Sequence, residues 1–180
     1  YEIPRSDWSS DVCSSDLKCY KFLVLEETKM FFDQELCLFH IKPDDQTQLF
    51  EKMYEKLYLS GCVKSSFLDG ITTREAEYPT GLEFNGIGFA IPHTDSVNVN
   101  KSQICFASLD EPVIFQDMTD KSHNIEVNLV FMLAMAVPHE QVETLQNLMA
   151  LFTDDEKVKR LRELSSKEDF IKLLNDSGVY

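Results

Sequence analysis

A single histidine, His93, stands where a reactive side chain would be displayed. Residues 86–93 read Gly-Ile-Gly-Phe-Ala-Ile-Pro-His, in which large apolar residues alternate with small ones, as in a strand under close cover. Pro92 lacks an amide hydrogen and ends the strand, so His93 lies at a strand end, where functional residues often occur. A neutral imidazole has a free lone pair that can attack a phosphoryl group and later release it. On pattern alone, a histidine that merely begins a loop is the commoner interpretation.

Two other histidines are weaker candidates. His40 is expected near a strand start and His123 lies in a polar turn, and neither has a catalytic companion nearby in sequence. His93 and Asp95 could supply two metal ligands, but no third or fourth ligand follows at a suitable spacing. A glycine-rich nucleotide loop is also missing from the sequence. We therefore expect no metal and no cofactor.

The chain is strongly acidic, with 17 Lys and Arg residues against 31 Asp and Glu residues and a formal net charge of -14. Long-range repulsion argues against nucleic acid and anionic membranes as partners and favours a basic protein. No apolar run approaches the roughly 20 residues needed to cross a bilayer. The cysteines show no CxxC pair or disulfide-like spacing, which suits reduced thiols. We expect a cytoplasmic protein.

The hydrophobic pattern predicts the elements that must position the candidate histidine. One helix is expected to be capped by Asp44 or Asp45, and a second by Ser65. Three strands are predicted, the last of them an unbroken apolar run typical of a strand buried on both faces: residues 87–91, 104–109 and 127–134.

A long helix is predicted to open at Pro138, because proline is tolerated in a first helical turn. Its inward face is expected to comprise Val142, Leu145, Leu148, Met149 and Phe152. Two closing helices should begin after Asp154 and Ser166. Together these elements predict a single α/β domain with a mixed, mostly parallel sheet between helical layers.

Several motifs in order carry a family resemblance. They are Thr-Arg-Glu-Ala-Glu-Tyr-Pro-Thr-Gly at residues 73–81, the segment at 86–93, Val-Ile-Phe at 113–115 and Leu-Val-Phe-Met-Leu-Ala at 129–134. From about Phe32 to Leu174, the chain resembles the IIA component of the sugar phosphotransferase system, in the fructose/mannitol-type superfamily. The 74–81 motif and the helix from 138 to 151 resemble the galactitol-specific branch most closely.

The resemblance implies that Nε2 of His93 receives a phosphoryl group from the histidine phosphocarrier protein and passes it to a cysteine of a IIB component. The membrane component IIC would be served only indirectly. Arg74 stands at the family's arginine position, where a guanidinium would neutralise phosphoryl charge. The alternative for Arg74 is a surface arginine that pairs with Glu75 or Glu77.

Thr94 could offer a hydroxyl or amide to the phosphoryl group, and a simple loop residue is an equal interpretation. Mannitol and fructose relatives carry a second active-site histidine near the start of the long helix. Counting back along the helix places Gln141 at that position, and Gln141 can hydrogen-bond a phosphoryl oxygen without titrating. His139, two residues earlier, would point about 200° away. An alignment slip of two residues would restore His139 to the site.

The first residues are expected to lie outside the domain. Residues 1–17 spell the translation of a common sequencing adapter, with residues 4–6 as a sample barcode, so we interpret them as an artefact. The alternative is a natural polar tail. Residues 18–29 form an uncertain leader before a plausible start at Met30, and residues 30–180 form the expected domain.

Two functions follow from the resemblance. The first is a phosphoryl carrier for a sugar or polyol, with galactitol or a related polyol as the expected substrate of the system. The alternative is a regulatory module, in which phosphorylation of the same histidine changes binding to a transcription factor or kinase.

Overall fold

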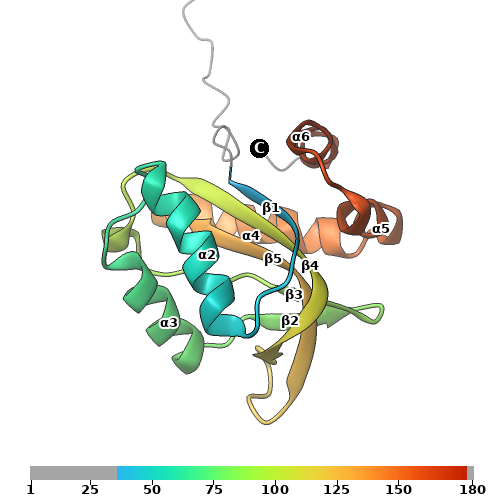
Figure 1. The fold of residues 1–180 in the computed structure, drawn as a ribbon, viewed down its shortest axis with the longest axis horizontal. Coiled ribbons are helices and arrows are strands. Elements are labelled where there is room, and N and C mark those ends of the chain that lie inside the picture. Colours follow the sequence, from blue (N-terminus) through green and yellow to red (C-terminus); the bar gives the residue numbers. More distant parts are fainter. Residues whose placement is uncertain (1–35, 178–180) are drawn as a thin grey trace, which may run out of the picture.

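A computed structural model describes residues 36–177 (Figure 1). Within these residues a five-stranded sheet lies between two layers of helices, which confirms the predicted α/β class and the mixed sheet. No helix in this range is long and apolar enough to cross a membrane. The expectations for residues 1–17 and 18–29 fall outside the described residues.

The strand order in the sheet is β1-β4-β5-β3-β2. Two of the four pairings are parallel, β1 with β4 and β3 with β5, and two are antiparallel. Parallel and antiparallel pairings are therefore equal in number, whereas mostly parallel pairing was predicted. The reason is that β2–β3 and β4–β5 are joined by short turns, which connect only antiparallel neighbours. The strands are β1 (Cys37–Ile41), β2 (Gly81–Phe84), β3 (Ile87–Ala90), β4 (Gln103–Gln116) and β5 (Asn124–Ala134).

Each face of the sheet has its own apolar core. The helices α2 (Gln46–Leu59) and α3 (Phe67–Glu77) cover one face. The helices α4 (Pro138–Phe152), α5 (Asp155–Glu163) and α6 (Lys167–Asn175) cover the other (Figure 1). Alternate side chains of the central strands point to opposite faces, so β4 and β5 contribute to both cores.

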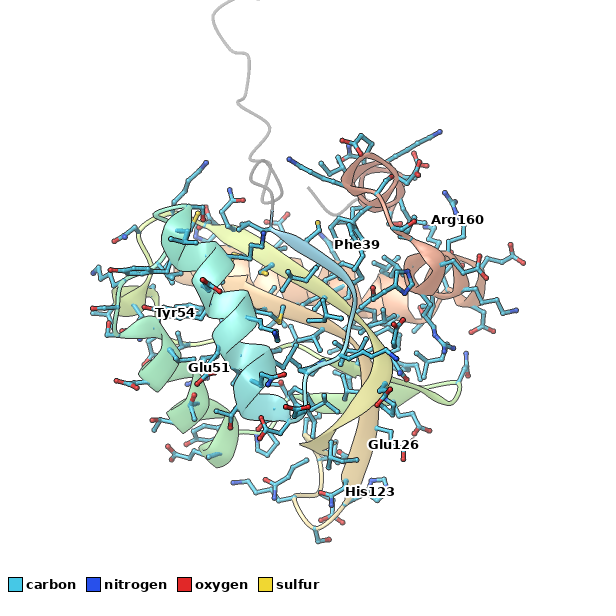
Figure 2. All side chains as sticks on the ribbon, viewed as in Figure 1. Phe39, Glu51, Tyr54, His123, Glu126 and Arg160 are labelled. Carbon is cyan, nitrogen blue, oxygen red and sulfur yellow. The ribbon has the colours of Figure 1, made fainter. Side chains whose placement is uncertain are left out.

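Stacked phenylalanines dominate the core beneath α4, α5 and α6. Phe106 of β4 stacks on Phe170 of α6 with ring centroids 4.4 Å apart, and Phe89 of β3 stacks on Phe152 of α4 at 4.1 Å. Phe39 of β1, labelled in Figure 2, forms an edge-to-face contact with Phe170 at a centroid distance of 6.3 Å. These contacts hold α4 and α6 against the sheet.

Three of the four predicted caps are confirmed. The carboxylate of Asp45 accepts the amide hydrogen of Gln48 at 2.8 Å, Asp154 caps α5, and Ser166 caps α6. The prediction for α3 was wrong by one residue. The helix follows Ser66, whose hydroxyl donates to Asn98 at 2.7 Å and makes no cap hydrogen bond.

Three strands and one helix face differ from expectation. Strand β1 was not predicted, and His40, expected near a strand start, lies one residue before the end of β1. Strand β4 runs on to Gln116 past a register shift after Ser108, so residues 113–115 belong to it. Strand β2 was not predicted, although Asn85 and Gly86, which both have a positive φ, form the Asn-Gly pair typical of a two-residue hairpin turn before β3. Val142 was expected to face inward but is 58% exposed, and Thr144 is buried instead. The start of α4 is therefore rotated relative to the predicted face.

Candidate functional site

His93 lies three residues after the end of β3, the strand that pairs with β5. The carbonyl of Pro92 accepts the amide hydrogen of Leu133 at 2.9 Å, and His93 forms an isolated parallel bridge with Leu133. Gly88, on the same strand, has no room for a side chain, since an added Cβ would lie 2.0 Å from the carbonyl oxygen of Glu126. The backbone that presents His93 is thus held closely against β5.

The imidazole of His93 is oriented by the main chain. Its Nδ1 lies 2.8 Å from the carbonyl oxygen of Ile91. Because a carbonyl oxygen only accepts hydrogen bonds, Nδ1 must carry the hydrogen, and Nε2 keeps its lone pair when the ring is neutral. The sequence did not reveal this acceptor, because nothing in residue type distinguishes one carbonyl from another.

The surroundings of His93 lower its pKa and so favour the neutral ring. Burial is the largest influence and lowers the pKa of His93 below its ordinary value. The hydrogen bond to Ile91 acts in the opposite direction, and the positive charge of Arg74 lowers the pKa further. Asp95 contributes a smaller opposing effect. The imidazole of His93 is therefore neutral near pH 7, with the lone pair of Nε2 free.

Arg74 lies on α3, next to the loop that follows His93. Its Nη1 is 3.7 Å from Oδ1 of Asp95, and its guanidinium lies 5.3 Å from the centre of the Tyr78 ring. The partner is thus Asp95, where Glu75 or Glu77 was the alternative from sequence. Within the described residues, the buried Nε of Arg74 has no hydrogen-bond partner. One donor of the guanidinium is therefore uncommitted.

Helix α3 approaches the loop after His93 very closely. A Cβ added at Gly70 would lie 2.8 Å from the hydroxyl oxygen of Thr94 and 2.7 Å from the side-chain nitrogen Nδ2 of Asn98. Thr94 is buried, and its hydroxyl accepts a hydrogen bond from Asn98 at 3.3 Å. The hydroxyl hydrogen can be donated elsewhere. Arg74 and Thr94 line one hollow of about 340 Å³.

The structure places Gln141 in the first turn of α4, where it is half-buried. No hydrogen bond joins Gln141 to His93 in the described part of the chain. His139 is exposed on the same turn. Between them, Glu140 is buried and its carboxylate accepts the hydroxyl hydrogen of Ser102 at 2.6 Å, which anchors the start of the helix.

Sequence reasoning missed the role of Glu75, which is only 4% exposed. Its two carboxylate oxygens accept hydrogen bonds from the amide and the hydroxyl of Thr80, at 2.9 Å and 2.8 Å. Burial is the main influence and raises the pKa of Glu75, while both hydrogen bonds oppose this. A glutamate directly after an arginine suggests a surface ion pair, so the pattern offered no signal for this buried contact.

A second hollow, of about 280 Å³, opens beside His93. Its lining is mostly apolar and comes from the connection after α3, from β2 and from the β4–β5 turn. Lys121 of that turn donates to the carbonyl of Glu77 at 2.5 Å and so ties the turn to the end of α3. The lining includes Tyr78, Pro79, Leu82, Ile91, Met118 and Met149. Glu77 and Tyr78 line both hollows, which therefore adjoin.

The other two histidines each have a carboxylate neighbour that the sequence did not suggest. Nδ1 of His40 lies 3.1 Å from Oδ1 of Asp110, and Nδ1 of His123 lies 3.5 Å from Oδ2 of Asp117. In the described range no group of three or more His, Cys, Asp or Glu side chains could hold a metal ion.

Comparison with known proteins gives a family match and several relatives. The family described as "Phosphoenolpyruvate-dependent sugar phosphotransferase system, EIIA 2" matches residues 30–177. The galactitol-specific EIIA component of Escherichia coli (strain K12) is 27% identical over 136 residues, which cover 74% of this chain and 90% of that protein.

Two solved structures share the fold. One is the complex of enzyme IIA-Mtl and phosphorylated enzyme IIB-Mtl from Escherichia coli, with a TM-score of 0.64 and 22% identity over 78% of this chain and 94% of that chain. The other is nitrogen regulatory protein IIA-Ntr from Neisseria meningitidis, with a TM-score of 0.60 and 23% identity over 77% and 92%. These likenesses show that the chain shares the fold of the two solved structures.

Proposed function

The chain belongs to the EIIA 2 family of the phosphoenolpyruvate-dependent sugar phosphotransferase system, and from this premise we propose that His93 carries the phosphoryl group. EIIA components are relay phosphotransferases, so the chain is a phosphoryl carrier. The observation that supports His93 is the 2.8 Å hydrogen bond from Nδ1 to the Ile91 carbonyl, which leaves Nε2 as the nucleophile.

The transfer has two steps on this ring. The Nε2 lone pair of His93 attacks the phosphorus of a phosphohistidine on the histidine phosphocarrier protein, and the new N–P bond forms as the donor's N–P bond breaks. The donor imidazole leaves with the electron pair of that bond. A thiolate of the IIB component then attacks the same phosphorus. An S–P bond forms as the bond between Nε2 of His93 and phosphorus breaks, and its electron pair returns to Nε2 of the neutral ring.

Arg74 and Thr94 stabilise the transferred group in this proposal. Phosphoryl transfer depends mainly on positioning and on neutralising negative charge, which suits the permanently charged guanidinium of Arg74. The hydroxyl of Thr94 adds a neutral donor from the residue that follows His93. Gln141 is proposed as an amide donor from the first turn of α4, where mannitol and fructose relatives carry a second histidine.

The surface around His93 suits protein partners. Tyr78 and Met118 line the apolar hollow beside His93, and both are more than half exposed. Exposed apolar side chains next to a reactive group are typical of a docking surface. The solved IIA-Mtl relative forms a complex with its phosphorylated IIB enzyme. We propose the histidine phosphocarrier protein and a IIB component as partners in the cytoplasm, with IIC reached through IIB.

The proposed substrate of the system is galactitol or a related polyol. The support is the 27% identity to a galactitol-specific EIIA component. The test is to present phosphorylated chain to purified galactitol-specific and mannitol-specific IIB components and compare initial rates. Faster transfer to the galactitol-specific IIB is expected, and a preference for the mannitol-specific IIB would contradict this substrate.

The carrier assignment is tested by labelling. The chain is incubated with radiolabelled phosphoenolpyruvate, enzyme I and the histidine phosphocarrier protein. We expect one acid-labile, base-stable phosphate on His93, and none in His93→Ala. His139→Ala is the matched control and should accept label fully. Stoichiometric label in His93→Ala would overturn the assignment.

A further inference from the structure

A second site centres on His40, whose backbone has an unusual conformation. Its φ of 54° lies in the left-handed region, which is costly for a residue with a side chain. The pairing of β1 with β4 shifts register between Leu38 and Ile41, and β4 shifts again after Ser108. Such irregularities re-aim side chains and concentrate near functional sites. The fold thus turns the imidazole of His40 away from regular strand geometry.

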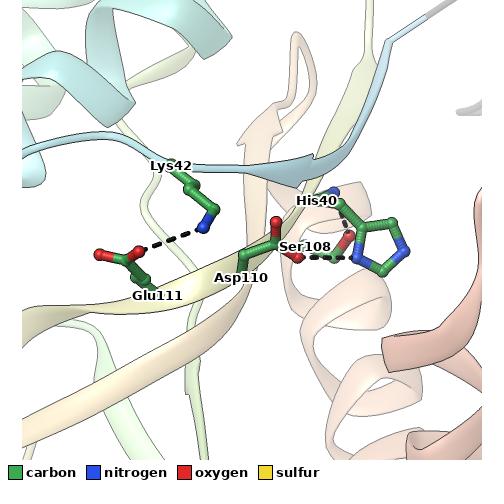
Figure 3. A network of polar contacts seen from close by, with 5 residues as sticks. All are labelled: His40, Lys42, Ser108, Asp110 and Glu111. Atoms are coloured by element: carbon green, nitrogen blue, oxygen red, sulfur yellow. Dashed lines mark hydrogen bonds and ion pairs between the residues drawn. The ribbon is translucent and has the colours of Figure 1, made fainter.

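Two residues of β4 hold His40 in this position (Figure 3). The hydroxyl of Ser108 accepts the backbone amide hydrogen of His40 at 3.0 Å, and Oδ1 of Asp110 lies 3.1 Å from Nδ1. Figure 3 shows that the second ring nitrogen points away from Asp110. Since Nδ1 is engaged by the carboxylate, Nε2 is the nitrogen available to a ligand.

His40, Ser108 and Asp110 line a cavity of about 410 Å³ between the sheet and α5. Lys159 and Arg162 line it from α5, three residues apart and so on one face of that helix. Within the described residues neither cation forms an ion pair or a hydrogen bond, although Asp110 and Glu163 line the same cavity. Two cationic side chains without an ion-pair partner in the described residues thus line one cavity, although the chain as a whole is acidic.

We propose that this cavity binds a small phosphorylated polyhydroxy compound. A guanidinium pairs with phosphate oxygens through two donors and an ammonium adds a point charge, so Arg162 and Lys159 form the phosphate end. The strands β4 and β5 contribute acceptors for ligand hydroxyl groups to the same lining, namely the Asp110 carboxylate and the Asn128 side-chain amide. The volume lies within the usual range for small-molecule sites.

The site is separate from the one at His93, because its lining shares no residue with the two hollows there. Binding at His40 does not require phosphoryl transfer. The biological meaning of this ligand rests on the proposed carrier function, because a sugar phosphotransferase system produces compounds of this chemical class. The carrier would then sense its own product.

The test uses full-length His93→Ala, which removes phosphoryl transfer and keeps the second cavity. Mannitol 1-phosphate, mannitol and inorganic phosphate are titrated separately while amide shifts are followed by NMR. We expect saturable shifts in β1, β4 and α5 with mannitol 1-phosphate, and binding about tenfold or more weaker with either fragment. Equal affinity for inorganic phosphate would overturn the polyhydroxy ligand, and shifts centred on Arg74 would overturn the site.

Arg162→Ala and Arg160→Ala form a matched pair on α5. Both arginines are exposed, and Arg160 does not line the cavity; Figure 2 shows it on the outer side of the helix. Loss of a charge-assisted contact should weaken mannitol 1-phosphate binding about tenfold or more in Arg162→Ala and leave Arg160→Ala unchanged. Equal affinities in the two variants, or no saturable binding in the parent, would overturn the proposal.

Discussion

At the scale of single residues, the reactivity of His93 depends on its charge. A protonated imidazole has no lone pair to attack phosphorus, and burial lowers the pKa of His93. Phosphoryl acceptance should therefore hold constant as the pH falls to about 6.5, the ordinary histidine value, and decline only below it.

Arg74→Gln offers a check on this explanation. Arg74 lowers the pKa of His93, so its removal should raise the midpoint of the His93 titration, followed by NMR of the ring nitrogens. The acid limb of the rate profile should move to higher pH with it. A midpoint that stays in place or falls would show that Arg74 does not act electrostatically on the ring.

Arg74→Gln should also slow the transfer step itself. Loss of one preorganised donor to a charged transition state typically costs about 10²-fold in rate. We expect this loss in single-turnover transfer at pH 8, where His93 is neutral in both proteins, with Arg74→Lys in between because it keeps charge without paired donors. Arg160→Ala is the control. Wild-type rates in Arg74→Gln would return Arg74 to a structural pairing with Asp95.

At the scale of elements, the connection between α3 and β2 depends on Glu75. Removing its carboxylate leaves the buried donors of Thr80 without acceptors, so Glu75→Ala should reduce the free energy of unfolding by about 1–3 kcal/mol. The exposed Glu77→Ala should change it little. Chemical denaturation measures both. Similar small effects in the two variants would mean that water replaces the Glu75 contact.

Elements with strong local signals were predictable, and contacts between distant segments were not. The alternation at 87–91 and the apolar run at 127–134 identified β3 and β5, and Asp45 and Ser166 marked helix starts. A proline and a strand end, which are local features, drew attention to His93, and the family resemblance was needed to favour it over a histidine that merely begins a loop. Three contacts could not be predicted in this way. The acceptor role of the Ile91 carbonyl and the burial of Glu75 depend on the local path of the chain, and the pairing of His40 with Asp110 joins residues far apart in sequence. Residue type along one sequence does not encode them.

At the scale of the whole molecule, the net charge of -14 predicts a salt-dependent association. Raising the salt from about 0.05 M to 0.5 M shortens the range of electrostatic attraction. With a basic partner, KM for the phosphocarrier should rise several-fold while kcat stays nearly constant. Steady-state transfer assays measure both constants. A KM that does not respond to salt would indicate that the apolar surface beside His93 dominates docking.

The main-chain acceptor at His93 has an evolutionary consequence. Many histidine nucleophiles are held by a carboxylate, which a single codon change can delete. Here the acceptor is the carbonyl of Ile91, and every amino acid at that position supplies the same oxygen. The tautomer of His93 is thus robust to point mutation at position 91, although the buried side chain of Ile91 still contributes to the core. Only an altered backbone, such as an ester at the following linkage, would probe it directly.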